Sequence, residues 1–371
     1  MRAATGMGTA RSRQVVRAFA NVGLSLLARL SGSAPFNLPP VPREPTHVPP
    51  GQPFAPAESY APDLPALPTL GGGVAEADGG AGGSFSPYTA RYLTHLSRLA
   101  YHPEAEARER CAELGLREFA WFERKADDPG EEDTQGFAAA NASHVVVVFR
   151  GSMGDADWKT SGEFETVDTK HGGVHKGFNA ALDDVWPSLL ETVLSLQQPN
   201  AVAEGGAPGE GSDPRPVLVT GHSLGAALAT LTAARLQLDQ GVPVSAVYTV
   251  GSPRVFDHVF AGAYDAALKA RTWRAVNNND YVPRIPLDTP IDVDGVNSRH
   301  VGNEVYINRK GQLGERSGLW DSALGQWDAL WGGNAGGNAL DPLEDHEPGH
   351  YEEAFRVAAL ALEEAATKVE L

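Results

Sequence analysis

The stretch that decides the fold runs from residue 217 to residue 232 and reads VLVTGHSLGAALATLT. Its first four residues are apolar or β-branched and favour a strand, whereas the Ala/Leu-rich second half favours a helix. Between them, residues 221–225 match the pattern G-x-S-x-G. In that pattern the serine occupies a strained strand-to-helix turn, and small residues two positions before and after it let the backbone turn without a clash. The spacing therefore predicts that Ser223 is a nucleophile.

The same turn provides a second functional group. It places the backbone N–H of Leu224 at the N-terminus of a helix, where it can donate to an oxyanion. A G-x-S-x-G match can also arise by chance in a chain with 41 glycines among 371 residues. The strand before it and the helix after it favour a nucleophile over a chance match.

Strands and helices alternate on both sides of this turn, which indicates an α/β fold with a largely parallel central sheet flanked by helices. Residues 145–149 form a continuous β-branched run of the kind found in sheets that are buried on both faces. The predicted strands are 138–140, 145–149, 217–220, 244–250 and 274–276, and the predicted helices are 178–196, 224–238 and 256–270.

The first 84 residues have a different composition. Six arginines precede the first acidic residue, Glu44. Residues 35–68 carry twelve prolines, and residues 71–83 carry seven glycines. Proline removes backbone donors and glycine adds chain entropy, so such segments do not build a packed core. We predict that residues 1–84 are a disordered extension and linker, and that residues 85–371 are one catalytic domain. The basic start is compatible with a secretory signal, an amphipathic targeting helix or a disordered tail.

Composition excludes several functional classes. A formal net charge of −17 argues against nucleic-acid binding, and the absence of a run of 18 apolar residues argues against a stable membrane span. The single cysteine, Cys111, forms no internal disulfide, and no cysteine–histidine spacing suggests a metal site. We expect Cys111 to be an inert packing residue, and we expect no metal and no cofactor. The sequence does not decide between a secreted and a cytoplasmic location.

Several strings, in the same order, resemble the class 3 (fungal-type) lipases of the α/β-hydrolase superfamily. Residues 217–232 resemble the family's nucleophile segment. The other matching strings are Leu96–Tyr101, Val148–Ser152, Val174–Phe178, Gly251–Val255, Asn279–Arg284 and His300–Tyr306. The resemblance covers about residues 85–360, and it implies the α/β-hydrolase fold and the cleavage of carboxylic esters.

A serine hydroxyl needs a base to take its proton and an acid to orient that base. In α/β-hydrolases both follow the serine, in the order acid and then histidine. Asp280 comes directly after a predicted strand, and the resemblance also assigns the acid to it, although an aspartate beside three asparagines can equally serve as a turn residue. For the base we favour His346 over His350, because the family places a late Asp-His before a tyrosine, here Tyr351.

The resemblance assigns the second oxyanion donor to Ser152, through its backbone N–H and its hydroxyl. It also places a short lid after this serine, at residues 153–160. That stretch is polar here, with Met153 and Trp158 as its large apolar residues, which favours soluble short-chain esters over interfacial activation. Arg150 and His175 are expected to be structural residues near the site.

The sequence therefore predicts a serine ester hydrolase, either a triacylglycerol lipase or a carboxylesterase, with the triad Ser223, Asp280 and His346. Its partner would be an ester or lipid substrate, met by transient contact with a lipid interface. The alternative is a non-catalytic signalling or scaffold protein that retains the hydrolase fold. A third hypothesis is an adaptor that binds its partner through the proline-rich segment.

Overall fold

The structure is a computed structural model, and it describes residues 85–124, 134–151, 165–198, 214–278, 280–285, 298–308, 311–314 and 345–369. All of these residues belong to one compact unit, which comprises residues 55–371. The predicted extension, residues 1–84, lies outside the described residues, so its boundary and its disorder remain predictions.

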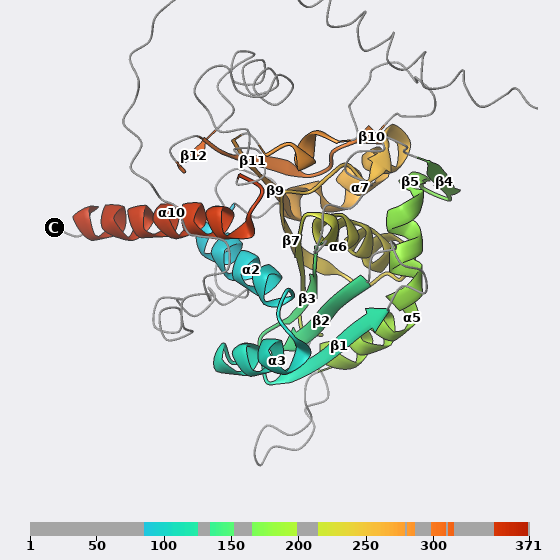
Figure 1. Cartoon of the computed structure of the whole chain (residues 1–371), viewed down its shortest axis with the longest axis horizontal. Helices are drawn as coiled ribbons and strands as arrows, with labels where there is room; N and C mark the ends of the chain where they lie inside the picture. The colour runs from blue at the N-terminus through green and yellow to red at the C-terminus, as the bar shows by residue number, and fades with distance from the viewer. Residues whose placement is uncertain are drawn as a thin grey trace, which may run out of the picture. The chain divides into compact units, whose positions relative to one another are not determined.

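A mixed sheet of eight strands forms the centre of this unit (Figure 1). Its five central strands are parallel neighbours, whereas β1 and β2 at one edge and β12 at the other are antiparallel. In spatial order the strands are β1 (Glu118–Arg124), β2 (Thr134–Ala140), β3 (Val145–Phe149), β6 (Val217–His222), β7 (Val244–Val250), β9 (Thr272–Asn277), β11 (Asn303–Ile307) and β12 (Leu313–Gly314).

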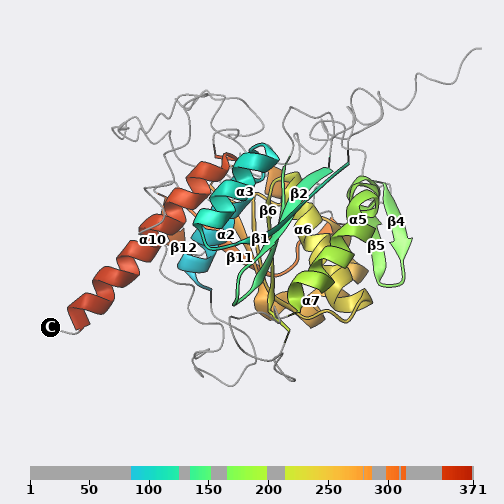
Figure 2. The ribbon, with the colours of Figure 1, turned by 90° about the horizontal axis from the view of Figure 1, so that it is seen from below.

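Helices cover both faces of the sheet (Figure 2). The strand period of two sends Val145 and Val147 of β3 into one hydrophobic cluster and Val146 and Val148 into the other. The first cluster is completed by α5 (Lys176–Gln197), α6 (Leu224–Ala234) and α7 (His258–Leu268). The second is completed by α2 (Pro87–Leu99), α3 (Glu104–Glu113) and α10 (Pro348–Val369). This is why the strand sequence is apolar at every position rather than at alternate ones.

Most predicted elements agree with the structure, and residues 145–149 and 244–250 are strands with the predicted bounds. One helix was predicted with the wrong start. Phe256–Asp257 form a short strand, β8, and α7 begins only at His258, because the Asp257 side chain caps the helix by accepting from the N–H of Phe260. The predicted helix 224–238 is α6 followed by a π-helical turn, Arg235–Asp239.

β8 belongs to a small antiparallel sheet that the sequence did not predict. Its other strands are β4 (Thr166–Thr169), β5 (Gly172–His175) and β10 (Ser298–Arg299). Among the described residues, no helix is both long and apolar enough to cross a membrane.

Candidate active site

Ser223 lies in the turn between β6 and α6, at the carboxyl edge of the parallel strands. Its backbone has φ 58° and ψ −126°, a conformation that costs a non-glycine residue roughly 1–3 kcal/mol. The two flanking glycines make the turn sterically possible. A Cβ atom on Gly221 would lie 2.2 Å from the carbonyl oxygen of Gly225, and one on Gly225 would lie 2.4 Å from that of Phe149. The backbone strain and the close packing support the nucleophile turn that the sequence predicts.

The side chains of Ser223, His346 and Asp280 form one hydrogen-bonded chain. Nε2 of His346 lies 2.8 Å from Oγ of Ser223, and Nδ1 of His346 lies 2.9 Å from Oδ2 of Asp280. Because a carboxylate oxygen only accepts, Nδ1 carries the imidazole hydrogen, and the lone pair of Nε2 accepts the serine proton. All three residues are buried, which strengthens these electrostatic interactions.

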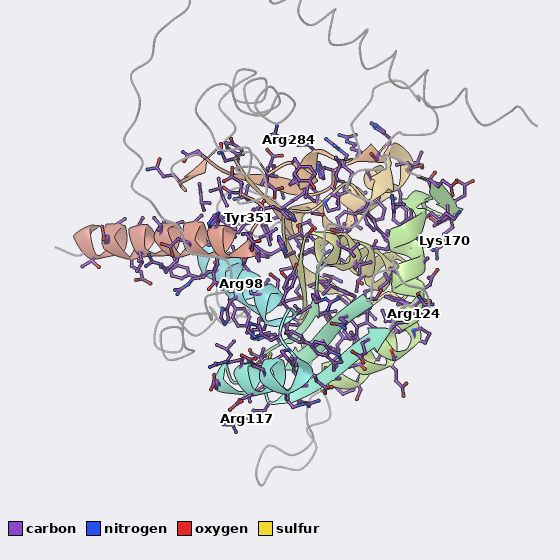
Figure 3. The ribbon with its side chains drawn as sticks, viewed as in Figure 1. Arg98, Arg117, Arg124, Lys170, Arg284 and Tyr351 are labelled. Atoms are coloured by element: carbon purple, nitrogen blue, oxygen red, sulfur yellow. The ribbon has the colours of Figure 1, made fainter. Side chains whose placement is uncertain are left out.

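Asp280 is completely buried and accepts hydrogen bonds from three groups. Besides His346, these are the N–H of Val282, at 2.9 Å from Oδ1, and the hydroxyl of Tyr351, at 2.5 Å from Oδ2. Tyr351 lies in the first turn of α10, beside the central sheet (Figure 3). Burial, and then the charge of Asp280, raises the pKa of Tyr351 well above its ordinary value, so the phenol remains a donor.

His346 lies in a loop that the end of β9 holds in place. The Nδ2 of Asn277 donates to the carbonyl oxygen of Asp345, and the Nδ2 of Asn278 donates to its carboxylate. The alternative base, His350, is exposed in the first turn of α10. The structure thus brings His346, and not His350, to Ser223.

Of the two predicted oxyanion donors, the structure describes Leu224 and not Ser152. Leu224 is the first residue of α6, so its N–H belongs to those that no carbonyl within the helix accepts. Ser152 lies outside the described residues, as does the predicted lid, and its role remains a prediction. Its neighbour Gly151 is close to the nucleophile, since a Cβ atom on Gly151 would lie 3.1 Å from Cβ of Ser223.

Sequence reasoning missed Gly251 as a site residue. Its φ of +61° lies in the left-handed region, and an added Cβ atom would lie 2.9 Å from Cε1 of His346 and 3.1 Å from Oδ2 of Asp280. The sequence contained a signal, because Gly251 directly follows the strand beside the nucleophile strand. A pattern of turn residues does not reveal, however, that this turn packs against a loop 95 positions later.

The residues expected to have structural roles are found in such roles. His175 caps α5 by accepting from the N–H of Phe178, and burial lowers the pKa of its imidazole to about 4. Arg150 donates to the side chain of Gln135. Cys111 is fully buried, and burial raises the pKa of its thiol to about 12, so the reactive thiolate is disfavoured.

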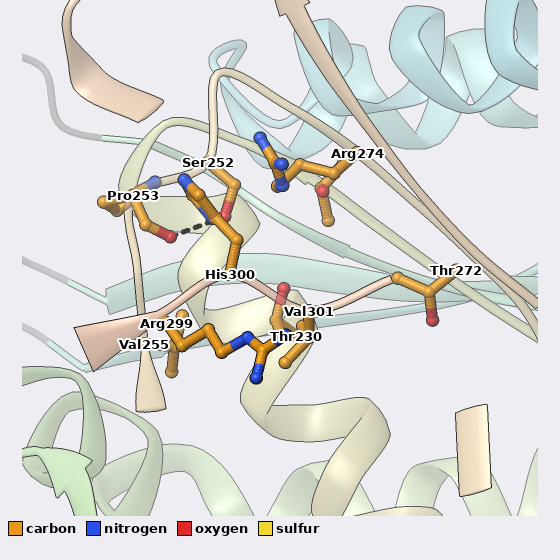
Figure 4. A pocket seen from close by; sticks show the side chains of 10 residues that line it. Thr230, Ser252, Pro253, Val255, Thr272, Arg274, Arg299, His300 and Val301 are labelled. Carbon is orange, nitrogen blue, oxygen red and sulfur yellow. Dashed lines mark hydrogen bonds between the residues drawn. The ribbon is translucent and has the colours of Figure 1, made fainter. Parts of the chain in front are cut away.

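A small cavity lies beside the turn that follows β7. Ser252, Arg274 and His300 are among its lining residues, and the hydroxyl of Ser252 donates to the carbonyl of Pro253 (Figure 4). Its volume of about 10 Å³ is enough for one water molecule and far too small for an acyl chain. Within the described ranges, no group of three or more His, Cys, Asp or Glu residues could hold a metal ion.

A serine in a strained strand-to-helix turn, linked through a histidine to a buried aspartate at the carboxyl edge of a mostly parallel sheet, defines the α/β-hydrolase fold. Residues 146–289 match the family model described as "Lipase (class 3)". Over this segment, which is less than half of the chain, the sequence is thus similar to the class 3 lipases.

The chain is similar to three relatives with different names. It is 36% identical over 145 residues to the secreted mono- and diacylglycerol lipase 1 of Fusarium solani, covering 38% of this chain and 39% of that protein. It is 35% identical over 167 residues to a lipase of Rhizomucor miehei, covering 42% and 41%. It is 30% identical over 215 residues to the phospholipase A1-II 6 of Oryza sativa subsp. japonica, covering 48% and 49%. The chain thus spans less than half the length of each relative.

Among solved structures, the native propeptide complex of Rhizomucor miehei lipase matches with a TM-score of 0.46 and 26% identity. The match covers 60% of this chain and 68% of that one.

Proposed function

We propose that this protein is a serine hydrolase that cleaves carboxylic esters through an acyl-enzyme on Ser223. One observation carries the proposal: the hydrogen-bonded chain from Ser223 through His346 to Asp280, located at the N-terminus of α6. The direction of its hydrogen bonds is that required for general-base activation of a hydroxyl nucleophile.

In the acylation step, Oγ of Ser223 attacks the ester carbonyl carbon while Nε2 of His346 takes the hydroxyl proton. The carbonyl oxygen becomes an oxyanion, which the N–H of Leu224 and the predicted donor at Ser152 stabilise. When the tetrahedral intermediate collapses, the carbon–oxygen bond to the alcohol breaks. His346 then gives its proton to the departing alcohol, and the acyl group remains on Ser223.

Deacylation repeats these steps with water as the nucleophile. His346 takes a proton from water, the hydroxide attacks the acyl carbon, and the carboxylic acid leaves as Ser223 recovers its proton. Throughout both steps Asp280 keeps the hydrogen of His346 on Nδ1 and stabilises the imidazolium that forms.

The substrate class that we propose is that of acylglycerols and simple carboxylic esters. The names of the relatives support the first, since they include mono- and diacylglycerol lipases, and the polar composition of residues 153–160 supports short acyl chains. Because the Fusarium solani relative is named as secreted, we also propose secretion, which fractionation of the producing cells would test.

The test is hydrolysis of p-nitrophenyl esters, from acetate to palmitate, by the wild-type protein and by Ser223→Ala. We expect wild-type turnover and a loss of about 10⁶-fold in kcat in the variant, because the nucleophile is removed. The chain-length profile distinguishes an esterase from a lipase. A folded wild-type protein that hydrolyses none of these esters would contradict the proposal and favour a non-catalytic hydrolase-fold protein.

The matched control is Ser143→Ala. Ser143 also has its hydroxyl 2.7 Å from a histidine nitrogen, Nδ1 of His144, but it lies before β3 at the opposite edge of the sheet. We expect this variant to retain wild-type kcat. Equal losses in both serine variants would indicate an effect on folding rather than on catalysis.

A further inference from the structure

His222 directly precedes the proposed nucleophile and is the last residue of β6, yet the mechanism above gives it no role. It is buried, with 4% of its surface exposed. Its Nε2 lies 2.7 Å from the carbonyl oxygen of His346, and its Nδ1 lies 2.7 Å from the hydroxyl of Tyr101. The rings of His222 and His346 are also in contact, with centroids 4.6 Å apart and planes tilted by 39°.

These two hydrogen bonds define the tautomer of His222. A backbone carbonyl oxygen only accepts, so Nε2 must carry the hydrogen. In the neutral imidazole Nδ1 is then the acceptor, and the hydroxyl of Tyr101 is its donor. The hydrogen bonds therefore run in one direction, from Tyr101 to His222 and from His222 to the backbone of His346.

The backbone of His346 determines where its imidazole lies. Asn277 holds the preceding carbonyl, that of Asp345, and His222 holds the carbonyl of His346 itself. Two consecutive carbonyls are thus fixed by side chains from two different strands, β9 and β6. Loss of the second hydrogen bond would leave a buried carbonyl without this donor and allow the peptide to rotate, which would displace Nε2 of His346 from Ser223.

We propose that His222, held in one tautomer by Tyr101, is a positioning residue that places the base His346 through its backbone carbonyl. The inference rests on the proposed function, because it assigns His346 the role of base. His222 touches neither the substrate nor the transferred proton in this scheme, and it acts only through His346.

The first test compares three replacements of His222 by kcat and KM. Gln carries an amide N–H at about the position of the histidine Nε2, whereas Asn is too short and Leu has no donor. We expect His222→Leu and His222→Asn to lower kcat by as much as ~100-fold with little change in KM, and His222→Gln to stay within ~10-fold of wild type. Equal losses in all three variants would indicate that only the shape of histidine matters, and would overturn the proposal.

The second test asks whether Tyr101 acts through His222. Tyr101→Phe should lower kcat roughly two- to tenfold, the effect of one hydrogen bond. In the His222→Gln background there is no ring nitrogen for Tyr101 to fix, so adding Tyr101→Phe should change kcat no further. Independent, additive losses would contradict the proposed order of action.

Tyr92→Phe is the matched control. Tyr92 lies on α2, is buried, and like Tyr101 has its hydroxyl close to a histidine nitrogen, 3.1 Å from Nε2 of His144 at the amino edge of the sheet. Its loss should lower the urea midpoint of unfolding slightly, as the loss of one hydrogen bond does, and leave kcat unchanged.

A measurement independent of turnover separates this inference from the proposed function. Nuclear magnetic resonance of ¹⁵N-histidine-labelled protein reports the tautomer of His222 and the low-field proton between His346 and Asp280. We expect the Nε2–H tautomer in the wild type, and a low-field proton that persists in His222→Gln but broadens or shifts in His222→Leu. An Nδ1–H tautomer, or an unchanged proton in His222→Leu, would overturn the positioning role even in a protein that hydrolyses no ester.

Discussion

The parallel strands of the central sheet end at a carboxyl edge and begin at an amino edge. Each of these two edges carries a serine hydroxyl beside a buried histidine. At the carboxyl edge, Ser223 contacts His346 at 2.8 Å, and at the amino edge Ser143 contacts His144 at 2.7 Å. A tyrosine also contacts a histidine at each edge, Tyr92 of α2 with His144 at one and Tyr101, just after α2, with His222 at the other. A search for close serine–histidine pairs would therefore find both.

The hydrogen-bond directions separate the two pairs. The hydroxyl of Ser143 donates to Oδ1 of Asn141, so it has no second hydrogen to give and accepts from Nδ1–H of His144. At the carboxyl edge the direction is reversed, because Asp280 takes the hydrogen of Nδ1 and leaves Nε2 of His346 as a base. Only the second arrangement can remove a proton from serine.

The two edges also differ in the charge near the histidine and in the backbone N–H groups near the serine. Burial, and then the guanidinium of Arg215, lowers the pKa of His144 to about 4, so this imidazole is a poor proton acceptor near neutral pH. The N–H groups of Ser143 and His144 are both bonded to the side chain of Asn141, whereas Leu224 begins a helix with its N–H directed away from any carbonyl of that helix. An ester hydrolase thus requires a carboxylate behind the imidazole and available donors in front of it.

The largest difference in kcat is expected between two variants that each remove one carboxylate, Asp280→Asn at the carboxyl edge and Glu118→Gln at the amino edge. Asp280→Asn should lower kcat by about 10⁴-fold, because an amide donor facing Nδ1 places the imidazole hydrogen on Nε2, opposite the serine. Stopped-flow or steady-state hydrolysis of a p-nitrophenyl ester measures this loss.

The control at the amino edge is Glu118→Gln. Glu118 pairs with the buried Arg215 through both guanidinium nitrogens, at 2.5 and 3.2 Å. Because Glu118 is partly exposed, its neutralisation should lower the free energy of unfolding by only roughly 1–3 kcal/mol and leave kcat unchanged. A fall in kcat comparable to that of Asp280→Asn would show that the two edges are coupled.

The sequence was sufficient to predict Ser223 because the strand, the turn and the helix that build its site are consecutive. Asp280 and His346 are separated from it by long intervals, and the structure brings to Ser223 the residues favoured by chain order and by the family's spacing. Their catalytic roles remain proposals. The Tyr101–His222 pair and Gly251 were not predictable in this way, since each depends on packing between segments far apart in sequence. Phe256 was misassigned because its strand partner, Val174, lies in a hairpin that has no strong sequence pattern.

A smaller difference is expected for two glycines with nearly the same backbone. Gly251 at the carboxyl edge has φ +61°, and Gly241, which precedes β7 at the amino edge, has φ +67°. An alanine in either position should cost about 1–2 kcal/mol of backbone strain. Only Gly251→Ala also pushes a methyl group towards His346 and Asp280, since nothing lies within 4 Å of an added Cβ atom at Gly241.

We therefore expect Gly251→Ala to lower kcat by about 100-fold and Gly241→Ala to leave it unchanged, while urea unfolding shows a loss of stability in both. If both variants lost stability but neither lost activity, the close approach of Gly251 to the His346–Asp280 pair would have no importance for catalysis.

The smallest effect concerns stability alone and depends on pH. His144 has a pKa of about 4 in the folded protein and an ordinary value of 6.5, so between these values the unfolded chain binds the additional proton. The free energy of unfolding should then fall as the pH drops through this window, by a total of roughly 3 kcal/mol from His144.

The variant His144→Gln removes the contribution of His144 to this pH dependence. His175, whose pKa is also about 4, keeps a similar dependence in both proteins. Urea unfolding at about pH 7 and about pH 5 should show a smaller loss on acidification in the variant than in the wild type. The kcat/KM of the two proteins should be the same at both pH values, because His144 lies at the opposite edge of the sheet from Ser223. If the wild type and His144→Gln lost the same free energy of unfolding on acidification, His144 would be protonated in the folded protein. Only the direction of its hydrogen bonds would then distinguish His144 from His346.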